Sequence, residues 1–170
     1  MCTHGLWNVI GGRGALPQRH QTDAHPSRLA VWSARDVSTA AGRIVVALEE
    51  STYLTIVCPL LPLPGFVPAF AASVGTALES LGIPTDLAQS EVAAIVRSVS
   101  FARNDNRSLL GSVNDVAFHA DVQLEGARRN DLSALIRAQK ELNDMPHVHR
   151  EPPFPSQAVR LLFRTAFAVH

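Results

Sequence analysis

Residues 43–59, RIVVALEESTYLTIVCP, carry the strongest β signal in the 170-residue chain and decide its predicted fold. Residues 43–48 and 52–58 are rich in Val, Ile, Thr and Tyr, the β-branched and aromatic types that favour strands. The polar triplet at 49–51 separates them, which is typical of a β-hairpin. Because proline has no backbone N–H, Pro59 is expected to end the second strand.

The chain after the hairpin shows helical periodicity. Apolar residues recur at helical spacing over residues 66–81, and a second helix is expected from Thr85, which is placed to act as its N-cap. Residues 107–125 carry an apolar stripe along one side of a third helix. Asn130 is expected to cap a fourth helix, and residues 156–167 are expected to form the last one.

Three other segments complete the predicted arrangement. Residues 98–102, SVSFA, are expected to form one more short strand, whereas residues 29–33 fit either a strand or a helix. Residues 11–28 are rich in Gly, Pro and His without periodicity, which predicts a surface loop. Early strands followed by helices indicate an α+β fold, in which about five helices cover a small, mainly antiparallel sheet with an early β-hairpin. The length fits a single domain over residues 1–170.

The composition excludes several classes of function. Fifteen basic residues balance fifteen acidic ones, and this balance argues against general nucleic-acid binding, which needs a surplus of positive charge. Residues 51–78 contain no charged residue, but four prolines interrupt them and the period changes from strand-like to helix-like. A membrane span is therefore not expected. The uncharged middle of the chain and its 46% hydrophobic residues are compatible with a homodimer.

The cysteines and the N-terminal residues indicate a reducing compartment. Cys2 and Cys58 are the two cysteines, so the chain has no disulfide framework and no CxxC zinc motif. Cys58 lies in an apolar run, where a thiol usually behaves as a small buried hydrophobe. The first twenty residues lack the basic start and continuous apolar core of a secretory signal. We therefore expect a cytoplasmic protein, and no motif calls for a cofactor.

The stretch 101–118, FARNDNRSLLGSVNDVAF, concentrates polar residues where a strand is expected to give way to a helix. The unpaired N–H groups at a helix start, together with Arg103 and Arg107, would form a pocket for a small anion such as phosphate or carboxylate. The predicted ligand-binding residues are five members of this stretch: Asn106, Arg107, Ser108, Asn114 and Asp115. Arg107 would pair with the anion, Asn106 or Ser108 would cap the helix, and Asp115 would orient Arg107 or an asparagine. The alternative interpretation is that the polar residues only close the turn.

Other side chains in the same region suggest different chemistry. Asp115 and His119 are four residues apart on a helix and form a candidate acid–base pair for a small hydrolase or transferase, with Ser108 or Ser112 nearby. Gly111 is unfavourable inside a helix and suggests close approach by a ligand or by another backbone, including the sheet beneath it.

Three histidines are candidates for a metal site. His147 and His149 lie two residues apart in a proline-flanked loop, and His119 would supply a third imidazole. Solvated loop histidines are the simpler interpretation. A further alternative for the whole chain is a structural subunit whose polar motif only stabilises its own core.

The same stretch resembles the hallmark of a bacterial family of small uncharacterised proteins, a domain-of-unknown-function family. The positions that match its pattern are Phe101, Ala102, Asn106, Arg107, Ser108, Leu110, Gly111, Ser112, Asn114, Asp115 and Phe118. The similarity extends to CTHGLW near the start, to the hairpin, and to LNDMPHVHREPPFPSQAVRLLF near the end. The loop at 11–28 is longer than the family pattern, and Arg103 and Asp105 replace more neutral residues. The resemblance implies a shared fold and polar centre, and it implies no activity.

Overall fold

A three-stranded antiparallel meander forms the centre of the protein. The computed structural model describes Leu6, residues 27–103 and residues 106–164. The strands are β1 (Trp32–Thr39), β2 (Gly42–Glu49) and β3 (Thr55–Pro59), and they lie in the order β1-β2-β3. The predicted small antiparallel sheet with an early hairpin is therefore confirmed, as is the α+β class.

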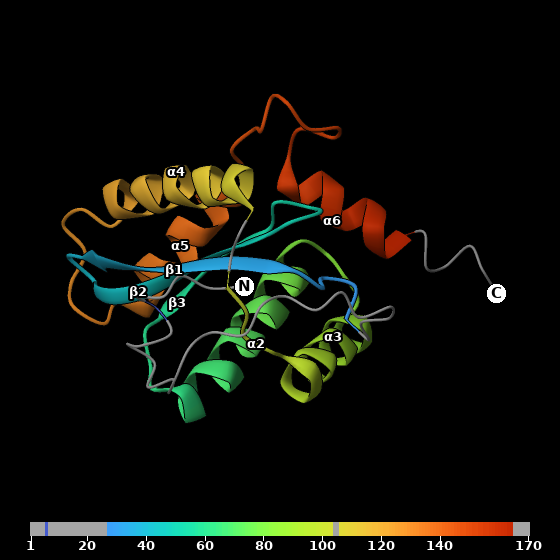
Figure 1. The fold of residues 1–170 in the computed structure, drawn as a ribbon, viewed down its shortest axis with the longest axis horizontal. Helices are drawn as coiled ribbons and strands as arrows, with labels where there is room; N and C mark the ends of the chain where they lie inside the picture. The colour runs from blue at the N-terminus through green and yellow to red at the C-terminus, as the bar shows by residue number, and fades with distance from the viewer. Residues whose placement is uncertain (1–5, 7–26, 104–105, 165–170) are drawn as a thin grey trace.

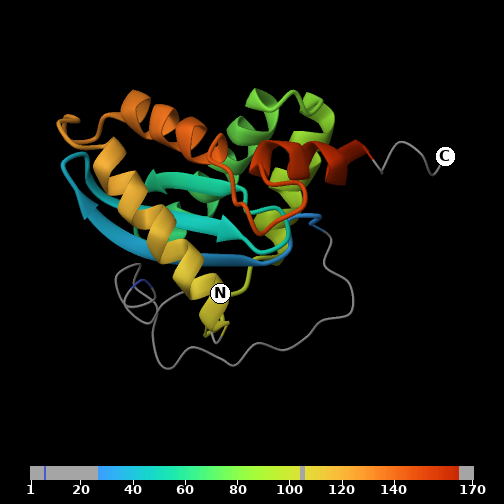
Figure 2. The ribbon, with the colours of Figure 1, turned by 90° about the horizontal axis from the view of Figure 1, so that it is seen from above.

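Five helices cover the two faces and one end of this sheet in the described residues. They are α2 (Leu63–Ser80), α3 (Thr85–Ser98), α4 (Arg107–Gln123), α5 (Leu132–Asn143) and α6 (Pro155–Arg164). Figure 1 shows α4 and α5 on one face of the sheet and α2 and α3 on the other. The view in Figure 2 shows α4 crossing β1 and β2, while α5 lies alongside β3.

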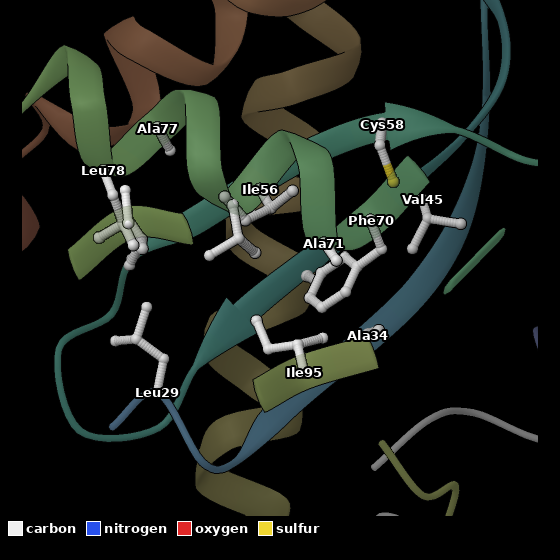
Figure 3. Close-up of a cluster of buried hydrophobic side chains, with 14 of the residues drawn as sticks. Leu29, Ala34, Val45, Ile56, Cys58, Phe70, Ala71, Ala77, Leu78 and Ile95 are labelled. Carbon is white, nitrogen blue, oxygen red and sulfur yellow. The ribbon is translucent and has the colours of Figure 1, made fainter. Parts of the chain in front are cut away.

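The sheet divides the interior into two apolar cores. Alternate residues of β2 point to opposite faces: Val45 and Ala47 belong to the core under α2 and α3, and Val46 belongs to the core under α4 and α5. Burial on both faces explains why β2 is continuously apolar instead of alternating. Figure 3 shows the first core, in which Cys58 and Phe70 are among the buried side chains.

Cys58 is buried as expected, and burial raises the pKa of its thiol to about 12.

Side chains of α5 occupy the outer edge of β3. The amide oxygen of Gln139 accepts from the Val57 N–H at 2.9 Å. Asn143 accepts from the Thr55 N–H and donates to the Thr55 carbonyl, both at 2.8 Å. Both asparagine and glutamine are buried, so these bonds fix α5 against the strand in a dry environment.

Two strand predictions need correction. Strand β1 covers Trp32–Thr39, whereas the sequence predicts only a short piece at 29–33 that fits a strand or a helix, because β1 contains Ser, Arg, Asp and Thr among few apolar residues. Residues 99–102 form no strand, and Ser98 ends α3. Phe101 instead packs against the first core, with its ring 6.3 Å from Phe66. The segment before α4 is thus a connection between two helices.

The helix ends also differ from the prediction in detail. Helix α3 begins at Thr85 but follows Pro84, and the Thr85 side chain does not act as its cap. Helix α5 is capped by Asp131, whose carboxylate accepts from the Ala134 N–H at 3.0 Å. Asn130 instead adopts a φ of 62°, a left-handed conformation that asparagine tolerates. The predicted loop at 11–28 and the end of the last helix at 167 fall largely outside the described residues.

Candidate binding site

Helix α4 begins at the polar motif, and Asn106 is its N-cap as predicted. The Asn106 side-chain oxygen accepts from the Leu109 N–H at 3.1 Å. Its amide nitrogen donates to the Glu50 carboxylate at 3.0 Å, which ties the start of α4 to the loop between β2 and β3. Asn106 therefore satisfies a helix-end N–H and joins two segments that are distant in sequence.

The helical period sends the remaining motif residues to different sides of α4. Ser108 and Ser112 are four residues apart and share one side, where Ser112 Oγ lies 3.5 Å from the hydroxyl of Tyr53. Arg107, Gly111 and Phe118 share another side and are exposed. The motif residues therefore lie on two surfaces of α4. Ser108 and Ser112 are on the side of the β2–β3 loop, and the other three face outward.

Asn114 is also exposed, and it links α4 to the sheet. Its side-chain oxygen accepts from Arg35 Nη1 of β1 at 2.5 Å. This contact occupies one polar atom of a predicted ligand-binding residue within the fold itself.

The β2–β3 loop is held in shape by a buried carboxylate. One oxygen of Glu49, a residue only 2% exposed, accepts from the N–H and hydroxyl of Ser51 and from the N–H and hydroxyl of Thr52 at 2.7–2.9 Å. The loop then places Tyr53, which is buried, at a φ of 60°. A left-handed φ is uncommon for a bulky residue and is maintained by the surrounding contacts.

Five side chains from three segments converge at Tyr53, and we refer to them as the tyrosine cluster. Tyr53 comes from the β2–β3 loop and Ser112 from α4. His147, His149 and Arg150 come from the turn between α5 and α6. The His147 ring centroid lies 4.8 Å from that of Tyr53, and the His149 centroid lies 6.1 Å from it. The cluster combines two hydroxyls, two imidazoles and a guanidinium.

Arg150 is the fixed cation of the tyrosine cluster. Its guanidinium carbon lies 4.4 Å from the centroid of the Tyr53 ring, a cation–π arrangement. One terminal nitrogen, Nη2, donates to the backbone carbonyls of Glu50 and Ser51. A guanidinium carries five N–H donors, so these two bonds hold Arg150 in place without using all of them.

His147 contributes a buried nitrogen without a hydrogen-bond partner. Its backbone N–H donates to Pro153 at 2.7 Å and its carbonyl accepts from the Arg150 N–H at 2.9 Å, so the turn is well ordered. Its Nε2 atom, in contrast, is buried and makes no hydrogen bond within the described part of the chain. Burial, followed by the charges of His149 and Arg150, lowers the pKa of His147 below 6.5. The surroundings therefore favour the neutral imidazole, which has an unused polar atom.

The candidate acid–base pair does not join the tyrosine cluster. Asp115 and His119 are both exposed on α4, and no hydrogen bond or ion pair links them among residues 27–103 and 106–164. The His119 ring lies against Phe118, with centroids 5.7 Å apart.

The candidate metal ligands are only partly brought together. The rings of His147 and His149 lie 6.3 Å apart. No group of three His, Cys, Asp or Glu side chains that could hold a metal ion occurs in the described residues. The three-imidazole hypothesis therefore gains no support from this arrangement.

Sequence reasoning missed Tyr53 and Arg150. Tyr53 is the single tyrosine of the chain and follows the polar triplet of the hairpin, and it was assigned to a strand. Arg150 follows the two histidines that were singled out. A local pattern cannot show that residues about a hundred positions apart meet.

The comparisons place the chain in a family. None of the described helices is both long and apolar enough to cross a membrane. Searches of curated proteins and of solved structures gave no match. The model of the family described as "Domain of unknown function (DUF6933)" matches residues 1–158, so the expected membership of a domain-of-unknown-function family is confirmed. The chain belongs to the DUF6933 family, whose members share a domain of unknown function.

Proposed function

We propose that this protein is a binding module that takes a small anionic ligand at the tyrosine cluster. The observation that carries the proposal is the buried, unpartnered Nε2 of His147, in a side chain that lies against the same Tyr53 ring as the Arg150 guanidinium. A buried polar atom without a partner is costly, and a ligand that supplies the partner recovers that cost.

The donors of the cluster favour a carboxylate or phosphate group. Arg150 offers a planar guanidinium, the group best suited to bidentate recognition of such anions. The Ser112 hydroxyl has acceptors within the chain, the Tyr53 hydroxyl at 3.5 Å and the Ser108 carbonyl at 3.3 Å, so the Tyr53 hydroxyl is the one of the two that can donate to a ligand oxygen. In this proposal Arg150 pairs with the anion, the role predicted for Arg107 from the sequence. Ser112 lies on the same side of α4 as Ser108, another predicted ligand-binding residue.

The predicted motif is connected to the tyrosine cluster through hydrogen bonds of Asn106 and Glu50. Asn106 caps α4 and bonds to Glu50, and the Glu50 carbonyl accepts from Arg150. This chain of contacts positions the start of α4 relative to the guanidinium. The motif residues on this side of α4 therefore act mainly by holding Arg150 in position. This role accounts for polar side chains that are hydrogen-bonded within the fold.

Nuclear magnetic resonance of the histidine side chains tests the proposal. Inorganic phosphate and acetate are titrated separately, and we expect a saturable shift of the His147 imidazole signals. A bound anion stabilises the imidazolium, so the pKa of His147 should rise when the anion binds. For the same reason, the anion should bind more tightly as the pH falls and His147 becomes protonated. The acetate and phosphate arms distinguish the two anion classes.

Two arginine variants make the test specific. Arg150→Gln should abolish the shift, whereas Arg137→Gln should retain it, because Arg137 is exposed on α5 and forms no hydrogen bond or ring contact with the cluster among the described residues. A His147 signal that does not respond to either anion, or that responds equally in Arg150→Gln, contradicts the proposal.

A further inference from the structure

The outward side of α4 contains a glycine that the fold does not explain. Gly111 lies within a 17-residue helix, where glycine is the least favoured residue apart from proline. A Cβ atom built at this position meets no described atom within 4 Å. Close packing on the sheet is therefore not the reason for the glycine, because the position is exposed.

A large apolar side chain lies on the same side of α4. Phe118 is 66% exposed and Val122 is 52% exposed, although both belong to a helix whose other side is packed on the sheet. Gly111 and Phe118 are seven residues apart, which places them two turns apart along one side of the helix, at about 10 Å. One side of α4 thus carries both a notch, by which we mean the gap left at Gly111 by the missing side chain, and the projecting ring of Phe118.

We infer that this side of α4 pairs with α4 of a second copy of the chain, antiparallel and about a two-fold axis. In an isologous interface, each contact occurs twice with the roles exchanged. If Gly111 lies opposite Phe118 of the second copy, Phe118 lies opposite Gly111 of that copy. Each ring then fills the other copy's notch, so a single register uses both unexplained features.

One pair of opposite charges on α4 agrees with the same register. Arg107 then lies opposite Val122 of the second copy, one position from Asp121, and the reciprocal contact is formed as well. A parallel pair would instead place Arg107 beside Arg107. The antiparallel pair also opposes the two helix dipoles favourably.

The size of the surface sets the expected affinity. A 17-residue helix is about 25 Å long, so one helix pair is a small interface by the standard of stable complexes. We therefore expect a dimer that dissociates on dilution. The inference is independent of the ligand proposal, because the tyrosine cluster uses the Ser108 and Ser112 side of α4.

Sedimentation velocity over a range of protein concentrations tests the dimer. The wild type should dimerise, Phe118→Ser should be monomeric, and Ile136→Ser, which removes an exposed residue of α5, should dimerise like the wild type. Circular dichroism shows whether each variant is folded. A wild type that stays monomeric up to about 1 mM, or a Phe118→Ser variant that dimerises normally, overturns the inference.

Two further variants test the register. Gly111→Ala should raise the urea midpoint of the monomer, because the added methyl group improves helix propensity in open space, and should weaken the dimer about tenfold because the notch is filled. Arg107→Glu should weaken the dimer, and adding Asp121→Arg should restore it. Unchanged dimer affinity in Gly111→Ala overturns the register.

Discussion

Removing the Glu49 carboxylate, which is buried at the end of β2, should destabilise the protein strongly. Glu49→Ala leaves the N–H groups of Ser51 and Thr52 without their acceptor, while the two hydroxyls can rotate towards others. A lost bond to a charged acceptor costs about 1.5–3 kcal/mol, and a buried unpaired N–H costs about 1–3 kcal/mol. Since the N–H of Thr52 is buried, we expect a loss of about 3–5 kcal/mol in the free energy of unfolding.

Equilibrium urea unfolding at neutral pH measures this loss. Glu49→Gln keeps an acceptor oxygen and loses only the charge, so it should cost about 1–2 kcal/mol. Glu79→Ala removes an exposed carboxylate from α2 and should stay within about 0.5 kcal/mol of the wild type. The reasoning fails if Glu49→Ala costs less than about 1 kcal/mol, or if Glu49→Gln costs as much as Glu49→Ala.

Two other predictions concern α5 and the following turn. Asn143→Ala removes the partner of the Thr55 N–H and carbonyl and should cost about 2–4 kcal/mol by urea unfolding, whereas Lys140→Ala, an exposed change on α5, should cost little. The pKa of His147 is lowered in the folded state by burial, His149 and Arg150. The folded state therefore binds this proton less readily than the unfolded state, and the contribution of His147 to stability is complete above pH 6.5 and is lost as the pH falls below 6.5. The difference in unfolding free energy between about pH 7.5 and about pH 5.5 should therefore be smaller in His147→Gln than in the wild type, and an unchanged difference would contradict the lowered pKa.

The elements that the sequence predicted well are those whose pattern is local. Strand β2 and the helices α2, α4 and α5 have long apolar runs or stripes, and their existence and type follow from the pattern. Strand β1 was missed because most of its residues are only partly buried, so its sequence carries little alternation. Its pairing with the strongly apolar β2, across the two-residue turn between Thr39 and Gly42, makes it a strand.

The candidate site was half predictable for the same reason. The motif at 101–118 and the histidines at 147 and 149 are recognisable as concentrations of polar residues. Their meeting at Tyr53 depends on the Glu49-bound loop and on the packing of α5 and α6, which no local pattern encodes. Arg107, which is predicted to pair with the anion, is exposed on α4 on a different side of the helix from Ser112, and its role as a ligand stays a prediction.

The contacts between α5 and β3 also determine whether the sheet can grow. An edge strand normally offers its free N–H and carbonyl groups to any incoming strand, the first step of many aggregation reactions. On β3 the outward N–H groups of Thr55 and Val57 are occupied by Asn143 and Gln139, and the next outward position is Pro59, which has none. Strand addition on this side must therefore wait for α5 to detach, so the resistance of the β3 edge to strand addition is set by the local unfolding free energy of one helix.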